Sequence, residues 1–214
     1  MAPAETAEPF LPPPSRRSLR SLRGASRECR GCPLHANATQ TVFGEGASSA
    51  RVMLVGEQPG DREDRAGEPF VGPAGRVLDE SMEAAGIDRG DMYVTNAVKH
   101  FKWRQGRGKR RIHQRPSVGE VNACLPWLRA EVEAVGPAVI VCMGATAARA
   151  VLGPGIKVTE DRGSFVESGF GPLATVTVHP SSLLRIRDRA ERAAAKREFA
   201  ADLRGAAGRA DLHV

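Results

Sequence analysis

The sequence predicts an α/β protein: a three-layer α/β/α sandwich around a central four-stranded parallel sheet. Two observations lead to this prediction. First, four apolar or β-rich runs alternate with segments of helical spacing; the runs are residues 52–55, 92–98, 138–143 and 174–178. Second, polar residues suited to chemistry follow the ends of these runs. Because the carboxyl ends of parallel strands share one edge of a sheet, we expect a single crevice there.

The first half of the pattern runs from strand to helix to strand. Residues 52–55 are wholly apolar and read as a short buried strand. Residues 75–85 then place their apolar side chains on one face and stop at Gly86, a residue that favours a helix C-terminus. The β-rich run 92–98 follows as the second strand.

The longest helical pattern comes next. Ser117 and Glu120 form a capping box, and apolar residues recur at helical spacing as far as Val135. Cys124 lies on the inward stripe of this pattern. Pro126 predicts a kink or a restart of the helix.

The remaining elements continue the alternation. Residues 138–143 are wholly apolar, as expected of a central parallel strand covered on both faces. Gly144 begins another short helix, residues 174–178 form the fourth strand, and residues 188–203 form a charged amphipathic helix. We expect one domain over residues 25–205, between a disordered basic tail at 1–24 and a frayed end at 206–214.

Composition limits the classes of function. The 214 residues carry 31 Lys and Arg against 25 Asp and Glu, a formal charge of +6, which favours polyanionic partners. No apolar run approaches the ~20 residues needed to cross a bilayer, and the N-terminal residues lack the pattern of a secretory signal. We therefore expect a cytoplasmic protein, in which four cysteines indicate metal or cluster ligation more than disulfides.

Residues 99–115 form the most unusual segment. They include eight Lys and Arg and no Asp or Glu, so the charge predicts a loop that contacts phosphates. Phe101 and Trp103 in the same segment are available for stacking on bases. The cations that we expect to bind DNA are Arg107, Lys109, Arg110 and Arg111.

Candidate site residues follow the predicted strands. Glu57 and Gln58 lie in a tight Gly- and Pro-containing turn after the first strand. Phe70, in a Gly/Pro frame, is either a plug under this turn or a stacking platform for a planar ligand. Asn96 offers a donor and an acceptor that can read a base edge, or it is a turn residue with its hydrogen bonds satisfied. His179 ends the fourth strand at the same edge, although a lone strand-terminal His is more often structural.

Four motifs carry a resemblance to a known family. GEQPG (residues 56–60), PFVG (69–72), TNAVK (95–99) and HPSSLLR (179–185) resemble, in order and spacing, the motifs of uracil-DNA glycosylases that carry an iron-sulfur cluster. The resemblance covers residues 29–203. The basic segment with KRRIH looks like the insertion of the UdgX branch, whose members excise uracil and remain covalently attached to the abasic deoxyribose.

The resemblance implies roles for residues in the crevice. Phe70 would stack on uracil, Asn96 would hydrogen-bond its polar edge, and Gln58 would add amide contacts. His179 would donate a hydrogen bond to the uracil oxygen on which charge grows as the glycosidic bond breaks. The partners implied are uracil-containing DNA, single strands included, and free uracil as product; we expect a monomer.

The resemblance also makes His113 the nucleophile that captures the sugar cation before water does. We expect the surrounding cations to lower the pKa of His113 and so favour the neutral ring. Glu57 would orient the ring by accepting its other N–H, and Asp61 or Asp64 would position a water or the sugar. The alternative is that His113 only contacts a phosphate.

The implied cofactor is a 4Fe-4S cluster. The favoured ligands are Cys29, Cys32, His100 and Cys124, because His100 stands where the relatives have a cysteine. Cys142 is the alternative fourth ligand, although it lies within an apolar run, where a free cysteine is a common core residue.

Three functions remain open from the sequence. The first is a glycosylase that ends bound to its product, and the second is a glycosylase that turns over normally. The third is a zinc-stabilised nucleic-acid-binding module without chemistry, for which the CxxC pair and the basic segment would suffice.

Overall fold

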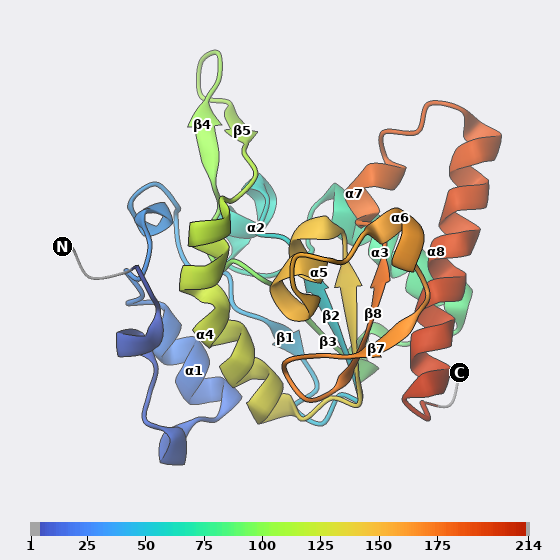
Figure 1. Cartoon of the computed structure of the whole chain (residues 1–214). Helices are drawn as coiled ribbons and strands as arrows, with labels where there is room; N and C mark the ends of the chain where they lie inside the picture. Colours follow the sequence, from blue (N-terminus) through green and yellow to red (C-terminus); the bar gives the residue numbers. More distant parts are fainter. Residues whose placement is uncertain (1–4, 213–214) are drawn as a thin grey trace.

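The structure, a computed structural model, describes residues 5–212. Within these residues, six strands form one sheet in the order β1-β3-β2-β6-β8-β7 (Figure 1). The four central strands are parallel, as predicted, and the edge strands β1 and β7 are antiparallel to their neighbours. The strands are β1 (Glu45–Gly46), β2 (Val52–Gly56), β3 (Met92–Asn96), β6 (Val139–Met143), β7 (Phe165–Glu167) and β8 (Leu173–Thr177).

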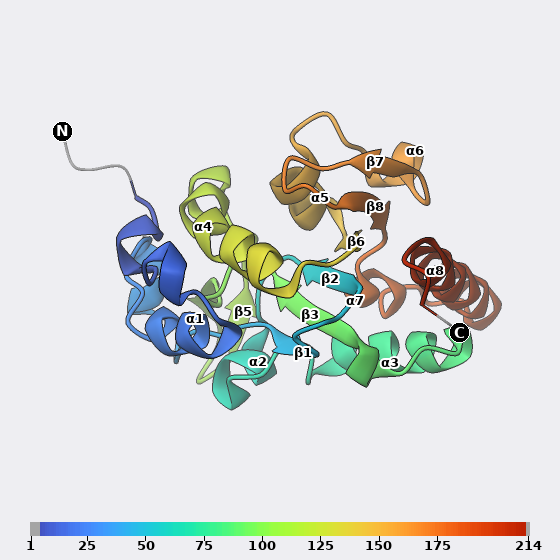
Figure 2. The same ribbon diagram turned by 90° about the horizontal axis from the view of Figure 1, so that it is seen from below.

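Helices cover both faces of this sheet, which confirms the three-layer sandwich (Figure 2). One face packs against α1 (Leu19–Ser26), α4 (Val118–Val135) and α5 (Ala145–Leu152). The other face packs against α3 (Pro73–Ala85), α7 (Pro180–Leu183) and α8 (Arg189–Arg209). Short helices α2 (Asp61–Ala66) and α6 (Val158–Asp161) and four 3-10 turns, at Glu8–Phe10, Pro14–Arg16, Pro33–Ala36 and Arg89–Asp91, complete the helical elements of the described residues.

The alternation of side chains along β2 explains why both layers are needed. Met53 and Val55 join one apolar core, which contains Trp127 of α4, while Leu54 joins the other, which contains Phe199 of α8. Because the side chains on both faces of β2 are apolar, neither face of the strand could be left in water. Helix α4 runs unbroken through its Pro126, so it does not restart there.

The strand register brings the loops together. Gly56 at the end of β2 pairs with Asn96 at the end of β3, and Met143 of β6 pairs with Thr177 of β8. The loops that follow these four strands consequently leave from one edge of the sheet, as the sequence predicts.

The basic N-terminal segment is folded where disorder was expected. The backbone N–H of Ala7 donates to Ala123 O in α4 at 2.8 Å, and Arg17 pairs with Glu133 at 3.3 Å. Leu22 of α1 is completely buried against α4. The prediction of a disordered tail is therefore wrong for residues 5–24, because these three contacts with α4 hold the segment despite its proline and arginine content; residues 1–4 lie outside the described part.

The C-terminal segment is also ordered over most of its expected frayed length. Helix α8 continues to Arg209, and Ala206, Ala207 and Ala210 are buried against the sheet. The backbone N–H of Leu212 donates to Ala207 O at 2.9 Å, and residues 213–214 lie outside the description. Among the helices of the described residues, none combines the length and the apolar character that a membrane span requires.

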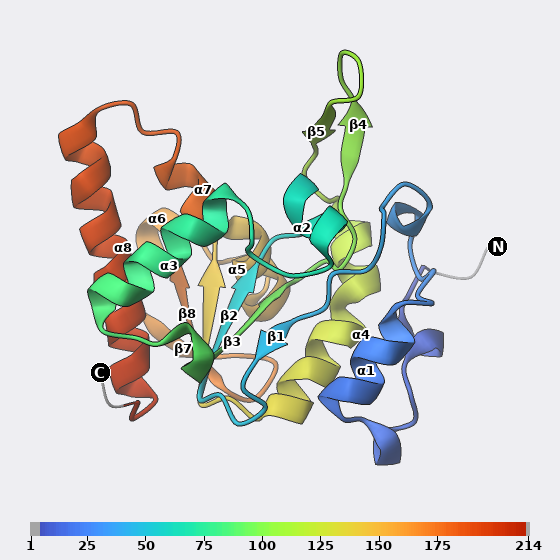
Figure 3. The same ribbon diagram turned by 180° about the vertical axis from the view of Figure 1, so that it is seen from behind.

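The basic segment forms a β-hairpin rather than an irregular loop. Strands β4 (Trp103–Gln105) and β5 (Arg111–His113) pair antiparallel, with Trp103 opposite His113. The hairpin stands away from the body of the molecule, with its tip at residues 106–110 (Figure 3). Its base, and therefore His113, lies beside the strand-end loops.

Candidate active site

A cavity of about 890 Å³ opens at the carboxyl edge of the sheet. It brings together residues from four strand-end loops and from the base of the hairpin. The sequence-predicted residues that line it are Glu57, Gln58, Asp61, Phe70, Asn96, His113 and His179. Lys109, Arg110 and Arg107 belong to the hairpin tip and are not among its lining residues.

Phe70 and Asn96 form the floor of this cavity around Gly56. A Cβ added to Gly56 would collide with Asn96 Oδ1 and would lie 2.6 Å from Phe70 Cζ, so only glycine permits this close approach. Phe70 has the unusual backbone angle φ of 56°, and a side chain at Gly75 would collide with its carbonyl oxygen. Phe70 is thus held in one strained conformation with its ring against the cavity.

Asn96 Oδ1 is buried and has no hydrogen-bond partner among the described residues. A buried amide oxygen without a donor costs about 1–3 kcal/mol, which a ligand with an N–H group would recover. The Asn96 backbone oxygen, in contrast, accepts a hydrogen bond from Lys99 Nζ at 2.7 Å. The backbone of Asn96 is therefore fixed by Lys99, while its side-chain oxygen lacks a donor.

Glu63 joins the two loops that carry Glu57 and Phe70. Its Oε1 accepts from Gly72 N at 2.7 Å, and its Oε2 accepts from Gly60 N at 3.1 Å. Glu63 was not singled out from the sequence, because a carboxylate in the first turn of a helix ordinarily indicates only a favourable helix-end charge.

His179 is held as a neutral ring with its proton on Nε2. The backbone N–H of Ser181 donates to His179 Nδ1 at 3.1 Å, so Nδ1 carries a lone pair. Burial, followed by the nearby His113 and Arg185, lowers the pKa of His179 to about 4. The ring packs against Gly144, where an added Cβ would lie 3.0 Å from His179 Cβ.

Gln58 sets the tautomer of His113. Gln58 Oε1 accepts from Lys102 N at 3.0 Å and its Nε2 donates to Gln114 O at 2.9 Å, which fixes the orientation of the amide. The same Nε2 lies 2.8 Å from His113 Nε2, which must therefore be the acceptor. The side-chain amide of Gln58 thus contacts residues at the foot of the hairpin, and Gln58 also lines the cavity.

His113 is neutral for a different reason than expected. Burial has the largest effect and lowers the pKa of His113, Glu57 raises this pKa, and Arg185 lowers it further. The cations of the hairpin tip are not the cause. The side chain is 50% exposed and faces the cavity, so its Nε2 remains accessible.

Glu57 lies beside the same nitrogen. Its Oε1 is 3.6 Å from His113 Nε2, which is too long for a hydrogen bond and is not a contact to the other ring N–H. Its Oε2 accepts a short hydrogen bond from Thr146 Oγ1 and lies 3.8 Å from Arg115 Nε. Thr146 and Arg115 were not singled out from the sequence, although Thr146 follows the end of β6 at the same sheet edge.

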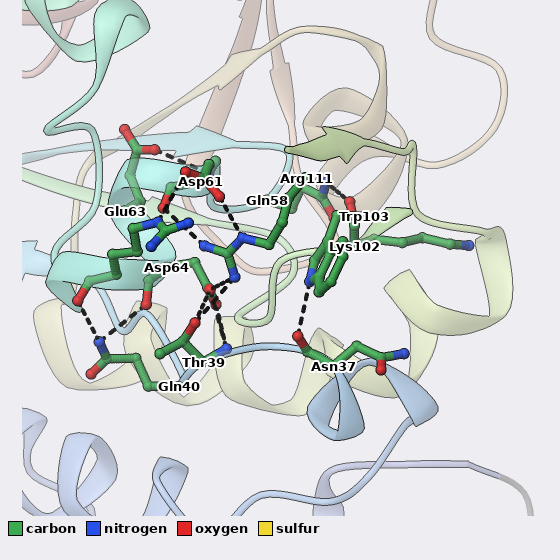
Figure 4. A network of polar contacts seen from close by, with 12 residues as sticks. Asn37, Thr39, Gln40, Gln58, Asp61, Glu63, Asp64, Lys102, Trp103 and Arg111 are labelled. Atoms are coloured by element: carbon green, nitrogen blue, oxygen red, sulfur yellow. Dashed lines mark hydrogen bonds and ion pairs between the residues drawn. The ribbon is translucent and has the colours of Figure 1, made fainter. Parts of the chain in front are cut away.

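Arg111 is a structural clamp, in contrast to the predicted role as a free DNA-binding cation (Figure 4). Its guanidinium binds Asp61 through a short ion pair, Asp64 at 2.6 Å and Thr39 Oγ1 at 3.1 Å. The side chain is only 10% exposed. Burial alone would raise the pKa of Asp61, but hydrogen bonds from Arg65 and Arg111 outweigh it and lower this pKa.

The two acidic residues expected near a water or the sugar are thus largely committed to this clamp. Asp64 is completely buried and also accepts from Thr39 N at 2.9 Å. Phe101 is buried and Trp103 donates its Nε1–H to Asn37 O at 2.8 Å; both rings flank Arg111. Phe101 therefore does not serve as a stacking surface for bases.

Three cysteines gather between the N-terminal segment and α4. Cys29, Cys32 and Cys124 are buried, and burial, opposed by Lys99, raises the pKa of Cys124 to about 12. Two N–H groups donate to these sulfurs: Trp127 Nε1 to Cys29 Sγ at 3.2 Å, and Lys99 N to Cys124 Sγ at 3.3 Å.

The other two ligand candidates differ in position. His100 directly follows Lys99 and is buried, which lowers its pKa to about 4. Cys142 lies within β6, and burial alone raises its pKa. Within residues 5–212, no group of three or more His, Cys, Asp or Glu side chains is arranged to hold a metal ion.

Comparison with known proteins places this site in a family. The chain matches the family described as the uracil DNA glycosylase superfamily over residues 43–204. It is 40% identical over 162 residues to a protein named type-4 uracil-DNA glycosylase from Thermotoga maritima, covering 75% of this chain and 80% of the relative. A protein of the same name from Pyrobaculum aerophilum is 34% identical over 174 residues, 78% of this chain and 85% of the relative. The chain belongs to the uracil DNA glycosylase superfamily.

Proposed function

We propose that this chain is a DNA repair enzyme that excises uracil from DNA and then bonds through His113 to the abasic deoxyribose. The observation that carries the proposal is the combination of four groups in one cavity: the Phe70 ring, the unsatisfied Asn96 Oδ1, the His179 Nε2–H and the His113 Nε2 lone pair. The first three suit a flipped base, and the fourth suits the sugar that carries it.

Base selection rests on Asn96. Uracil presents an N–H at ring position 3, which can donate to Asn96 Oδ1, whereas cytosine has a lone pair there and would leave two acceptors facing each other. The Phe70 ring would stack on the flipped base. Both residues already line the cavity before the base arrives, and both are buried, which keeps the ordering cost of binding low.

Base release rests on His179. As the C1′–N1 bond breaks, its electron pair moves to uracil, and charge grows on a uracil oxygen. A neutral imidazole that presents Nε2–H to the cavity stabilises this charge without giving up its proton. The carboxylate of Glu57 lies where it would face the positive charge that develops on the sugar.

Capture of the sugar rests on His113. The Nε2 lone pair forms a bond with C1′, and the ring, now cationic, later releases its Nδ1 proton to solvent while the uracil anion takes up a proton. Gln58 loses little when His113 Nε2 turns to the sugar, because the side-chain amide of Gln58 keeps its hydrogen bond to Gln114 O. A normal glycosylase would instead let water attack the same carbon.

DNA contacts are expected from two sides of the cavity. Arg107, Lys109 and Arg110 at the exposed hairpin tip would bind phosphates. Leu184 follows α7 at the cavity rim and is 46% exposed, which suits an apolar wedge that fills the space left by a flipped base. We expect the protein to act on single strands, as a monomer, in the cytoplasm, where its free thiols would stay reduced.

A 4Fe-4S cluster is the cofactor that we propose for the cysteine group. The chemistry of the donors supports this: three thiols are buried, and backbone and indole N–H groups donate to two of the sulfurs, as suits thiolate ligands. Cys29, Cys32 and Cys124 would hold it with His100, since Cys142 lies apart within the sheet. When bound, the cluster would fix the N-terminal segment to α4.

The covalent step is tested with a labelled single-stranded oligonucleotide that contains one uracil. The wild-type chain should give a band of reduced mobility on a denaturing gel, and His113→Ser should release uracil without that band. A thymine oligonucleotide is the control. A wild type that yields only free abasic strand would show that the enzyme turns over normally, and a chain that neither releases uracil nor shifts the band would overturn the enzyme reading.

The cofactor is tested separately. A cluster-bearing protein should purify brown and yield iron and sulfide on analysis, whereas a zinc protein would be colourless. Cys142→Ala should keep the colour and Cys124→Ala should lose it. The reverse result would place Cys142 among the ligands.

A further inference from the structure

Thr146, at the start of α5, contacts one carboxylate oxygen of Glu57, and His113 lies nearest the other. Its hydroxyl is buried and makes two polar contacts: Oγ1 donates a short hydrogen bond to Glu57 Oε2, and it accepts from Arg115 Nε at 3.2 Å. Glu57 Oε1 remains directed toward His113 Nε2 at 3.6 Å.

Only one arrangement of hydrogen bonds is possible at the Thr146 hydroxyl. An arginine N–H can only donate, so the lone pair of Thr146 receives it, and the single hydroxyl proton must then go to Glu57. The bond therefore fixes which carboxylate oxygen faces His113 and which is occupied. Valine has the same shape but cannot make either contact, and serine can make both.

We propose that Thr146 is a positioning residue that favours capture of the sugar by His113 over capture by water. This inference rests on the proposed function and names a further residue for it. With Oε2 occupied by Thr146, Glu57 offers one oxygen to the reacting centre, and that oxygen faces the imidazole.

Water and imidazole compete for the same carbon after the C1′–N1 electron pair has gone to uracil. Imidazole forms the C–N bond with its Nε2 pair and loses its Nδ1 proton later. A water molecule forms a C–O bond and must lose a proton to a nearby base. A carboxylate oxygen released from Thr146 would bind such a water and accept that proton, so loss of the hydroxyl should promote hydrolysis.

The test compares the full-length wild type, Thr146→Val and Thr146→Ser on the labelled uracil oligonucleotide. The measured quantity is the ratio of covalent product to free abasic strand, which alkali cleaves. We expect this ratio to fall about tenfold in Thr146→Val, as for the loss of one hydrogen bond to a charged group, and to stay at the wild-type value in Thr146→Ser. Because the ratio is taken within reacted DNA, partial unfolding of a variant does not change it.

Two results would overturn the inference. Equal ratios in all three proteins, or equal losses in the valine and serine variants, would show that the Thr146 hydroxyl does not direct the reaction, while covalent attachment itself would stand. A wild type that releases uracil with no covalent product would instead refute attachment, and the role of Thr146 with it.

Discussion

At the scale of single residues, burial lowers the pKa of two histidines, and different local contacts then give the two neutral rings different tautomers and different chemistry. A backbone N–H leaves the proton of His179 on Nε2, whereas the Gln58 amide leaves the lone pair of His113 on Nε2. One ring therefore acts as a donor toward the cavity and the other as a nucleophile. Their residue types are visible in the sequence, but their tautomers depend on contacts made across the fold.

The lowered pKa of His113 predicts how covalent capture depends on pH. The folded pKa of His113 lies below its usual 6.5, mainly because of burial, so the neutral ring persists below that pH. The single-turnover rate of band formation should stay constant from pH 8 through 6.5 and decrease only as the pH falls through the lower pKa. A rate that is already halved at pH 6.5 or above would contradict the assignment.

The same shifts affect stability in the same direction. A histidine whose folded pKa is lowered binds fewer protons in the folded than in the unfolded state, so its contribution is complete above pH 6.5 and is lost below it. In urea unfolding, the free energy of unfolding should decrease more from pH 7 to pH 5 for wild type than for His179→Gln, which has no titrating ring at this position.

At the scale of elements, the hairpin is the piece that positions His113, and Arg111 is what anchors it. Arg111 extends from β5 to Asp61 and Asp64 around α2, between the rings of Phe101 and Trp103. A buried guanidinium with two carboxylates and two flanking rings has one low-energy position. The hairpin is therefore attached at its base and free at its tip.

Separate effects are predicted for the base and the tip of the hairpin. Arg111→Ala leaves Asp64 buried without its cation, so the ratio of covalent to free product should fall about tenfold or more while uracil release continues. Arg110→Ala, at the exposed tip, is the matched control. It should weaken DNA binding and reduce the slope of DNA affinity against salt concentration by about one charge, and it should leave the ratio of covalent to free product unchanged. Equal effects of both variants on this ratio would contradict the role of Arg111 in anchoring the hairpin.

The elements also show what a sequence can and cannot indicate. The four central strands and helices α3, α4 and α8 have clear periodicity and were predicted with bounds within a few residues, except that α8 extends six residues further; α1 was not predicted. Strands β1 and β7 are too short to show a period, and the hairpin is hidden by its charge. Arg111 resembles its neighbours Lys109 and Arg110 in sequence; only the fold brings Asp61 and Asp64 to it.

At the scale of the whole molecule, one buried ion pair joins the cavity, the sheet and the helical layer. Lys99 and Glu131 of α4 are 1% and 0% exposed and form a short ion pair. Lys99 Nζ also donates to Thr95 Oγ1 and to Asn96 O, each at 2.7 Å, and its backbone N–H reaches Cys124 Sγ. All three Nζ protons have acceptors, which is the condition under which such a pair is tolerated.

Removal of one partner should therefore be far more damaging than removal of both. Lys99→Met leaves the Glu131 charge buried and unpaired, and we expect a loss of about 3–5 kcal/mol in the free energy of unfolding. Lys99→Met combined with Glu131→Gln removes that charge and should recover much of the loss, because Gly44 N and Tyr93 OH can still donate to the amide oxygen. Urea unfolding of the two variants measures both values. If the double variant recovered stability but not uracil release, the pair would serve chiefly to fix Asn96 beneath the base; recovery of both would make it a structural pair alone.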